Sequence, residues 1–369
     1  MSQLFSKNSP FLARWTAFKH DRRAAWIAFV VVGALLAALP FLVELGLGRS
    51  WVRVLNFTLL YIMLALGLNI VVGYAGLLDL GYVAFYAVGA YCYALLASPH
   101  FGLHLPFWII LPIGALVAGL FGILLGTPTL RLRGDYLAIV TLGFGEIIRI
   151  FLNNLNTPVN ITNGPQGINL IDPFHIGGIS LNQAHTIAGI TLPSTYNIYY
   201  LFLLLTLLII FISMRLQNSR IGRAWVAIRE DEVAAEAMGI NTRNIKLLAF
   251  AMGASFGGVS GGLFAGLQGF VSPESFNLLE SIMILCMIVL GGMGHIPGVI
   301  LGAVLLTVLP EALRYMGDLQ RYLFGSVIVD PADLRLLLFG LALIIMMIFR
   351  PAGLWPSPQR SRELSDVET

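Results

Sequence analysis

The sequence has little charge, almost no cysteine, and neither of two motifs that commonly mark metal or redox sites. Only 11% of its 369 residues are Asp, Glu, Lys or Arg. The net charge of +3 is too small to indicate a nucleic-acid partner. No HExxH or CxxC motif occurs, so the usual signs of a zinc hydrolase or a dithiol site are missing. We therefore expect neither catalytic residues nor a metal site.

The chain also lacks the glycine–lysine pair of a phosphate-binding loop. Its three lysines follow Ser6, Phe18 and Ile245, whereas a Walker A motif needs a lysine directly after glycine. We therefore expect no ATP site of this kind and no cofactor in this chain. Its two cysteines, Cys92 and Cys286, both lie inside apolar runs. That setting favours small buried side chains over a disulfide or metal ligands.

Apolar residues are what the sequence has in excess. Hydrophobic residues make up 57% of the chain, and the mean hydropathy is +0.84. They form blocks of about 17–25 residues, the length that crosses a bilayer as a helix. The sequence therefore predicts an all-α polytopic membrane protein in a lipid bilayer. The ten expected spans are 24–45, 54–73, 82–98, 106–126, 136–152, 196–214, 247–269, 278–292, 298–316 and 334–350.

Glycines interrupt or line several of these spans. The strings "GYAGLLDLGYV" and "GGMGHIPG" break the apolar runs beside them, which indicates discontinuous or re-entrant helices. Small residues recur at intervals of four in "GASFGGVSGGLFAG" and "GHIPGVILG". Such faces allow helix backbones to approach closely. They mark either tight packing or a gate, and the candidates for the gate are Gly257, Gly261, Gly292 and Gly294.

The distribution of positive charge predicts the orientation. With ten spans, sixteen of the 22 lysines and arginines lie on one side of the membrane, and Arg131 and Arg133 are among them. The loop 153–195, on the other side, has none. An excess of Lys and Arg marks the cytoplasmic side. We therefore expect both termini in the cytoplasm, and a short helix or hairpin in the outer loop. The expected parts are a cytoplasmic segment 1–23, a transmembrane domain 24–350 with an extracytoplasmic loop 153–195 and a cytoplasmic loop 215–246, and a cytoplasmic tail 351–369.

Few charged residues fall within the spans. Glu146 and Arg149 are three residues apart, so they share a helix face. They form either a site in the translocation path or a structural ion pair, and Glu311 and Arg314 repeat the spacing. Asp79 lies in the first glycine-rich break. A carboxylate beside unwound backbone is a candidate for an ion site or a gate.

The segment "IREDEVAAEAMGI" is a compact charged patch in the cytoplasmic loop. Val233, Ala237 and Ile240 fall at helical spacing and form one apolar stripe, and Gly239 is placed to end a helix. The segment is either a solvated amphipathic helix or a helix that docks into a groove of a soluble partner. In the second case the charged side chains would set register and specificity. The residues assigned to the site are Arg229, Glu230, Asp231, Glu232, Val233, Glu236, Ala237 and Gly239.

Long blocks of the sequence resemble the permease subunits of branched-chain amino-acid (Liv-type) ABC importers. These blocks include "LGLNIVVGYAGLLDLGYVAFYAVGAY", "IGRAWVAIREDEVAAEAMGI", "GFVSPESFNLLESIMILCMIVLGGMG" and "FRPAGLWP". The resemblance covers nearly the whole chain after about residue 55 and is closest to the longer of the two paired permeases. In such importers a coupling helix with the pattern Glu-Ala-Ala, then Gly three residues later, sits in a cleft of the ATPase. Here Gly239 matches, Val233 stands at the Glu position, and Glu232 precedes it.

This resemblance implies the parts that the chain lacks. Two ATPase subunits would bind ATP–Mg, a second permease would complete the pore, and an extracytoplasmic binding protein would deliver leucine, isoleucine or valine. The assembly would lie in the cytoplasmic (inner) membrane of a bacterium. Related importers carry urea, amides or other amino acids, so these substrates stay open. An ion-coupled secondary transporter is the alternative from another class.

Overall fold

The computed structural model describes residues 22–130, 132, 134–176, 179–187, 190–324, 330–350 and 353–355. The predictions made for 1–21, for Arg131 and Arg133, and for most of the tail 351–369 lie outside these residues. The chain divides into two compact units, 1–55 and 56–369.

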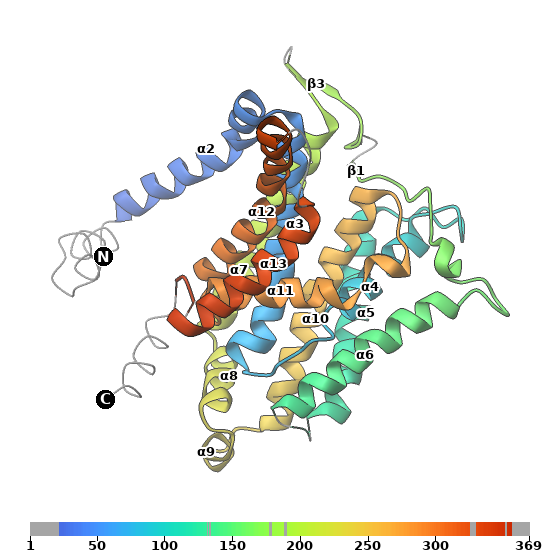
Figure 1. Ribbon diagram of the computed structural model, residues 1–369. Helices are drawn as coiled ribbons and strands as arrows, with labels where there is room; N and C mark the ends of the chain where they lie inside the picture. The colour runs from blue at the N-terminus through green and yellow to red at the C-terminus, as the bar shows by residue number, and fades with distance from the viewer. Residues whose placement is uncertain are drawn as a thin grey trace. The chain divides into compact units, whose positions relative to one another are not determined.

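A helix occupies every segment where the sequence predicts a span (Figure 1). These helices are α2 (Arg22–Leu47), α3 (Arg49–Asn69), α4 (Val83–Leu96), α5 (Phe107–Thr129), α6 (Asp135–Asn154), α7 (Ser194–Gln217), α10 (Thr242–Gln268), α11 (Leu278–Gly291), α12 (Ile296–Phe324) and α13 (Pro331–Phe349). Two further helices, α8 (Arg220–Glu230) and α9 (Glu232–Ala237), lie in the loop 215–246. The all-α prediction is confirmed in its main point, because short strands are confined to one loop.

Six helical segments among the described residues are long and apolar enough to cross a membrane. They are Arg49–Tyr74, Phe107–Thr129, Ser194–Gln217, Thr242–Gln268, Pro273–Gly291 and Ile296–Tyr322. The full count of about ten crossings and the cytoplasmic placement of both termini stay predictions.

The first unit contains α2 and the beginning of α3. Gly48 separates the two helices, and its N–H donates to the carbonyl of Glu44 at 3.1 Å. The carboxylate of Glu44 also accepts from Nε of Arg49 at 2.7 Å. Glu44 therefore links the end of one helix to the start of the next.

Helix α10 is central to the packing of the second unit and lies against α4 and α5. Two successive glycines face different neighbours. A Cβ at Gly257 would lie 3.3 Å from Cβ of Phe85 in α4, whereas one at Gly258 would lie 2.6 Å from the carbonyl oxygen of Gly114 in α5. A Cβ at Gly261 would collide with the backbone of α4 at Tyr86. The glycine face therefore packs backbone against backbone, as the small-residue spacing indicates.

The first break follows α3. The helix continues as the π-helix η2 (Ile70–Tyr74), and the chain then leaves helical geometry until α4 begins at Val83. The carbonyl of Thr141 in α6 lies so close to Gly81 that a side chain there would collide with it. The predicted discontinuity is thus present, and it lies against α6.

The second break separates α11 from α12 at residues 292–295. Gly292 has φ +122° and ψ 107°, a conformation that a residue with a side chain rarely adopts. The end of the described chain docks here, because the N–H of Trp355 donates to the carbonyl of Gly291 at 3.0 Å. The interruption predicted from "GGMGHIPG" is also present.

The loop 153–195 contains a short 3-10 helix and two hairpins, where the sequence predicts a short helix or a hairpin. The 3-10 helix η3 spans Gly164–Gln166, and η4 (Pro273–Ser275) lies in another loop. Strand β1 (His175–Ile176) pairs with β2 (Ile179–Ser180), and β3 (His185–Ile187) pairs with β4 (Ile190–Leu192), both antiparallel. In Figure 1 these hairpins lie at the end of the second unit opposite to α8 and α9.

Candidate functional site

The charged segment of the loop is divided between two helices, not one. Helix α8 is capped by Ser219, whose Oγ accepts from the N–H of Gly222 at 3.1 Å, and it ends at Glu230. Asp231 is extended, and its Oδ1 accepts from the N–H groups of Val233 and Ala234 at 2.8 and 3.0 Å. Aspartate at this position caps a new helix. Of the expected stripe, Val233 and Ala237 lie on α9, whereas Ile240 follows its C-terminus.

The end of α9 matches the prediction made for Gly239. This residue has φ +84°, and its N–H donates to the carbonyl of Glu236 at 2.9 Å. The N–H of Ile240 donates to the carbonyl of Ala235 at 3.1 Å. This is the Schellman pattern of a helix C-terminus, which favours glycine because of the left-handed backbone.

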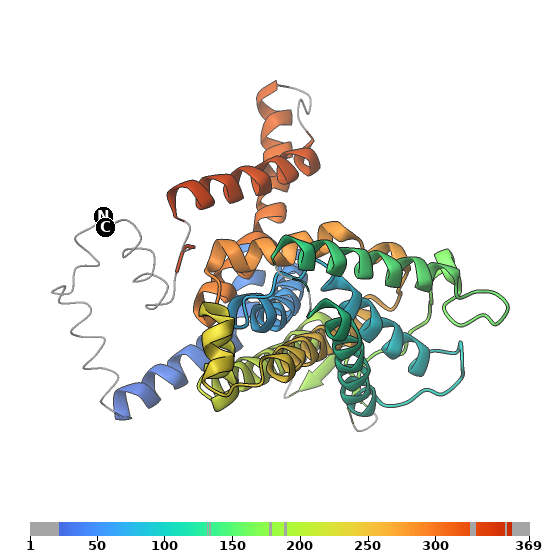
Figure 2. The same ribbon diagram turned by 90° about the horizontal axis from the view of Figure 1, so that it is seen from below.

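The outer face of α9 is apolar. Val233 is 66% exposed and Met238 is 84% exposed, while Ala237 is also exposed and Ile240 is half-buried. Ala235 faces inward. Of the predicted stripe, Val233 and Ala237 are exposed, and Met238 is a further exposed apolar residue that helical spacing from Val233 does not include. Figure 2 looks onto the end of the unit where α8 and α9 lie.

The four acids of the segment have different surroundings. Glu230 and Glu236 are exposed, whereas Asp231 caps α9. Oε1 of Glu232 lies 2.5 Å from Nζ of Lys246 in α10, and the side chain of Lys246 is only 7% exposed. This ion pair fastens α9 to α10. It borders an open cavity of about 280 Å³, lined by Thr127, Leu130, Glu232, Thr242, Arg243 and Lys246.

Arg229 points into the protein. Its Nη1 donates to the carbonyl of Gly73 in η2 at 2.8 Å. Its aliphatic part lies against Gly76, where an added Cβ would be 3.2 Å from Cβ of Arg229 and closer still to Cγ. We expected Arg229 to set register with a soluble partner, but this geometry connects it to the first break.

The two breaks meet beside Arg229. Oδ1 of Asn69 accepts from the N–H of Gly294 in the second break at 2.9 Å, and Nε2 of Gln217 donates to the carbonyl of Gly294 at 3.4 Å. A Cβ at Gly294 would lie 3.2 Å from the carbonyl oxygen of Gly73. We call Asn69, Gly73, Gly76, Arg229 and Gly294 the break junction. Asn69 is not among the residues assigned from the sequence, although an amide inside an apolar span is a signal for such a role.

Asp79 forms a turn within the first break. It is fully buried, and its Oδ1 accepts from the N–H of Gly81 at 2.8 Å, which is an Asx turn. The N–H of Leu80, which lies between these two residues, donates to Oγ1 of Thr141 in α6 at 3.0 Å. The bond to Gly81 gives Asp79 a role in shaping the turn, and a role in an ion site stays a prediction.

Glu146 and Arg149 form the expected pair. Nη2 of Arg149 lies 2.5 Å from Oε1 of Glu146, and Nη1 lies 3.2 Å from Oε1 of Glu274 in η4. All three side chains are partly exposed. The geometry favours the structural interpretation over a site in the path. Glu311 and Arg314 also pair, at 3.1 Å.

Serines in α10 fit the spacing of a hydrolase motif by coincidence. The strings "GASFG" and "GVSGG" read as GxSxG, but that motif needs a strand–turn–helix elbow. Here Oγ of Ser255 donates to the carbonyl of Ala251 at 2.8 Å, and Oγ of Ser260 donates to that of Phe256 at 2.9 Å. Both serines therefore bond to the preceding turn of their own helix.

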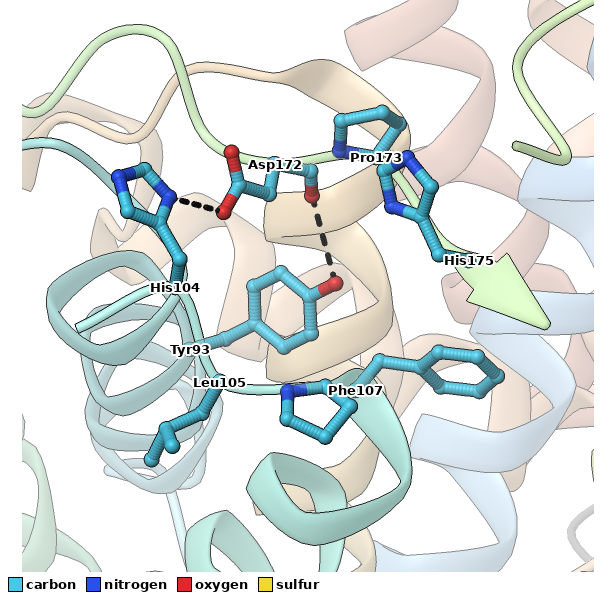
Figure 3. A pocket seen from close by; sticks show the side chains of 8 residues that line it. Tyr93, His104, Leu105, Phe107, Asp172, Pro173 and His175 are labelled. Atoms are coloured by element: carbon cyan, nitrogen blue, oxygen red, sulfur yellow. Dashed lines mark hydrogen bonds and ion pairs between the residues drawn. The ribbon is translucent and has the colours of Figure 1, made fainter. Parts of the chain in front are cut away.

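A cavity of about 320 Å³ lies beside the outer loop (Figure 3). Nδ1 of His104 lies 2.6 Å from Oδ2 of Asp172, and the hydroxyl of Tyr93 donates to the carbonyl of Asp172 at 3.4 Å. Figure 3 shows His175 on the opposite side of Asp172 from His104. Sequence reasoning missed this cavity, because its residues come from segments some eighty residues apart.

The histidines near this cavity do not converge on a metal site. His100 and His104 are four residues apart, a spacing that binds metal on a helix, but they lie in the loop between α4 and α5. Nε2 of His100 is 3.1 Å from the carbonyl of Asn160, whereas His104 contacts Asp172. Within the described residues no group of three or more His, Cys, Asp or Glu side chains is placed to hold a metal ion.

Comparison with known proteins gives the family. Residues 50–347 match the family model described as "Branched-chain amino acid transport system / permease component". The chain belongs to this permease family. It is 44% identical to the high-affinity branched-chain amino acid transport system permease protein LivM of Escherichia coli K12, over 91% of this chain and 76% of that protein. Identity to LivM of Salmonella typhimurium is 45%, over 87% and 73%. No solved structure matches the chain.

A second type of permease is also similar. LivH of Escherichia coli K12, another high-affinity branched-chain amino acid permease, is 25% identical over 81% of this chain and 92% of that protein. The resemblance to Liv-type permeases is confirmed, and the likeness to LivM is the stronger of the two. Family membership and the six long apolar helices together identify a multi-pass membrane transport permease.

Proposed function

We propose that this permease forms half of the translocation path of an ATP-binding-cassette importer for leucine, isoleucine and valine. The observation that carries the proposal is the 44% identity to LivM over 91% of the chain. The similarity to LivH suggests the second permease. Two ATPase subunits and an extracytoplasmic binding protein complete the proposed assembly, which lies in the cytoplasmic membrane of a bacterium.

We assign α9 as the surface that meets the ATPase. Val233 and Met238 are exposed apolar side chains on a capped helix, with Glu230 and Glu236 exposed near them. Central apolar contacts with charged surroundings are typical of protein interfaces. With this loop in the cytoplasm, the hairpins at the opposite end face the binding protein.

The contacts that hold α8 and α9 to α10 support a role for this loop in transmitting movement from the ATPase to the membrane helices. The Glu232–Lys246 pair and the indole N–H of Trp225, which donates to the carbonyl of Ile245 at 2.7 Å, hold α8 and α9 to the start of α10. Helix α10 in turn packs closely on α4 and α5 through its glycines. ATP binding would move α9, and the path would switch from outward-open to inward-open as these faces slide.

We expect leucine uptake only from the complete assembly with ATP. The experiment reconstitutes this chain with its second permease, both ATPases and the binding protein in liposomes, and measures uptake of labelled leucine. ATP should drive uptake, and a sodium or proton gradient without ATP should not. Uptake by the purified chain alone, driven by an ion gradient, would instead establish a secondary transporter.

The same liposomes separate the candidate substrates. Labelled isoleucine and valine should compete with leucine, while urea and short amides should not. ATP-driven uptake of urea or an amide, with leucine excluded, would keep the importer class but overturn the proposed substrate.

A further inference from the structure

We propose that Arg229 is the positioning residue that passes movement of the coupling loop to both helix breaks. This inference rests on the proposed function, because it takes α8–α9 as the loop that the ATPase moves. Nη1 of Arg229 donates to the carbonyl of Gly73 at 2.8 Å, across 156 residues of sequence. The donor therefore comes from the loop and the acceptor from the interrupted helix.

The hydrogen bond from Arg229 is made to the end of η2, where the helix itself supplies no partner for the backbone carbonyls. The last turn of a helix leaves carbonyls without partners in the helix, and their partial negative charge attracts cations. Gly73 lies in the last turn of η2 and is buried. A guanidinium is suited to this position because it stays charged and has several donors in a fixed geometry. Arg229 thus stabilises the end of η2 from outside it.

Contact with Gly76 makes the connection steric as well as polar. A Cβ at Gly76 would lie 3.2 Å from Cβ and 3.3 Å from Cδ of Arg229. The side chain of Arg229 therefore fills the space beside the first residues of the break. Movement of α8 toward or away from η2 changes this contact directly.

The second break is hydrogen-bonded to the helix that leads into the first break, next to Arg229. Gly294 donates its N–H to Oδ1 of Asn69 at 2.9 Å, and a Cβ at Gly294 would be 3.4 Å from Nη1 of Arg229. Arg229 thus bonds to the backbone of the first interruption, and its guanidinium lies beside Gly294 of the second. Neighbouring exposed acids of the loop, such as Glu230, lack this geometry, because their side chains point to solvent.

The test compares Arg229→Met with Arg223→Met in the complete reconstituted transporter. Arg223 lies on the same helix but is exposed, and its Nη1 bonds only to the neighbouring carbonyl of Asn218 at 3.0 Å among its described contacts. Arg229→Met should lower ATP-driven leucine uptake while ATP hydrolysis continues. A coupling free energy typical of linked sites predicts a fall of about 5- to 150-fold. Arg223→Met should keep uptake within about twofold of the unchanged protein.

A second readout separates transmission from folding. Leu78, half-buried in the first break, is replaced by cysteine after Cys92→Ser and Cys286→Ala, and its labelling by a maleimide is timed with and without ATP. ATP should change the labelling rate when Arg229 is present. Arg229→Met should abolish that change, and Arg229→Lys, which retains a cationic donor, should restore part of it.

The outcomes distinguish this inference from the proposed function. If the unchanged assembly shows no ATP-driven uptake, the proposed function fails. If that assembly transports normally and Arg229→Met matches Arg223→Met in uptake and in ATP-dependent labelling, Arg229 has no positioning role. An unchanged labelling rate at residue 78 with and without ATP in the active assembly would overturn the inference as well.

Discussion

Replacing Val233 and Met238 together with aspartate should detach the ATPase from this permease. Both side chains are exposed on α9, and burying an apolar side chain of this size contributes about 1.5–3 kcal/mol. Since 1.4 kcal/mol corresponds to a tenfold change in affinity, we expect association roughly 100-fold weaker or worse. The measurement is the amount of ATPase that co-purifies with the permease, together with ATP-driven uptake.

Conservative changes at the same positions provide the control. Val233→Ile and Met238→Leu keep an apolar surface, so association and uptake should persist. The aspartate variant should still insert and melt normally, because neither residue contributes to the core. Normal ATPase retention by the aspartate variant would contradict the assignment of α9 as the docking face.

Glu232→Lys should destabilise the permease itself. It replaces an ion pair at 2.5 Å with two ammonium groups, one of them on the buried Lys246. Removing the partner of a buried charge is strongly unfavourable. Because the carboxylate is 28% exposed, solvent screens part of the effect. We expect a loss on the order of 2–4 kcal/mol in the free energy of unfolding, measured as a lower melting temperature in detergent.

Glu236→Lys is the matched control for this prediction. Glu236 lies on the same short helix but is exposed, so its reversal should change stability by no more than about 0.5 kcal/mol. The double change Glu232→Lys with Lys246→Glu should recover part of the lost stability. Equal melting temperatures for Glu232→Lys and Glu236→Lys would show that the Glu232–Lys246 pair does not fasten α9 to α10.

Local patterns account for what could be predicted from the sequence. Apolar blocks located ten helices, because a helix that spans a membrane satisfies its own backbone. Gly239 could be assigned as a helix terminator, since its role depends only on residues within one helical turn of it. The glycines of α10 indicated close packing because small residues recur at intervals of four within that one segment. Each of these features is determined within one segment of the chain.

Long-range contacts account for what could not be predicted. The acceptor of Arg229 is 156 residues away in the sequence, and the partner of Asn69 is 225 residues away. No periodicity connects such positions, so Arg229 was grouped with the exposed acids beside it. The capping role of Asp231 could not be predicted for a different reason. Aspartate is common both on helix surfaces and at helix starts, and only the backbone shows that it caps α9.

Cross-linking from residue 238 tests whether α9 lies in the cytoplasm against the ATPase, as we propose. A photoreactive maleimide is attached to Met238→Cys in a protein without other cysteines, within the assembled transporter. Asn182→Cys, exposed in the outer loop, serves as the control position. We predict a covalent product with the ATPase from residue 238 and none from residue 182. A product with the ATPase from residue 182, or its absence from residue 238 in an actively transporting assembly, would contradict the account.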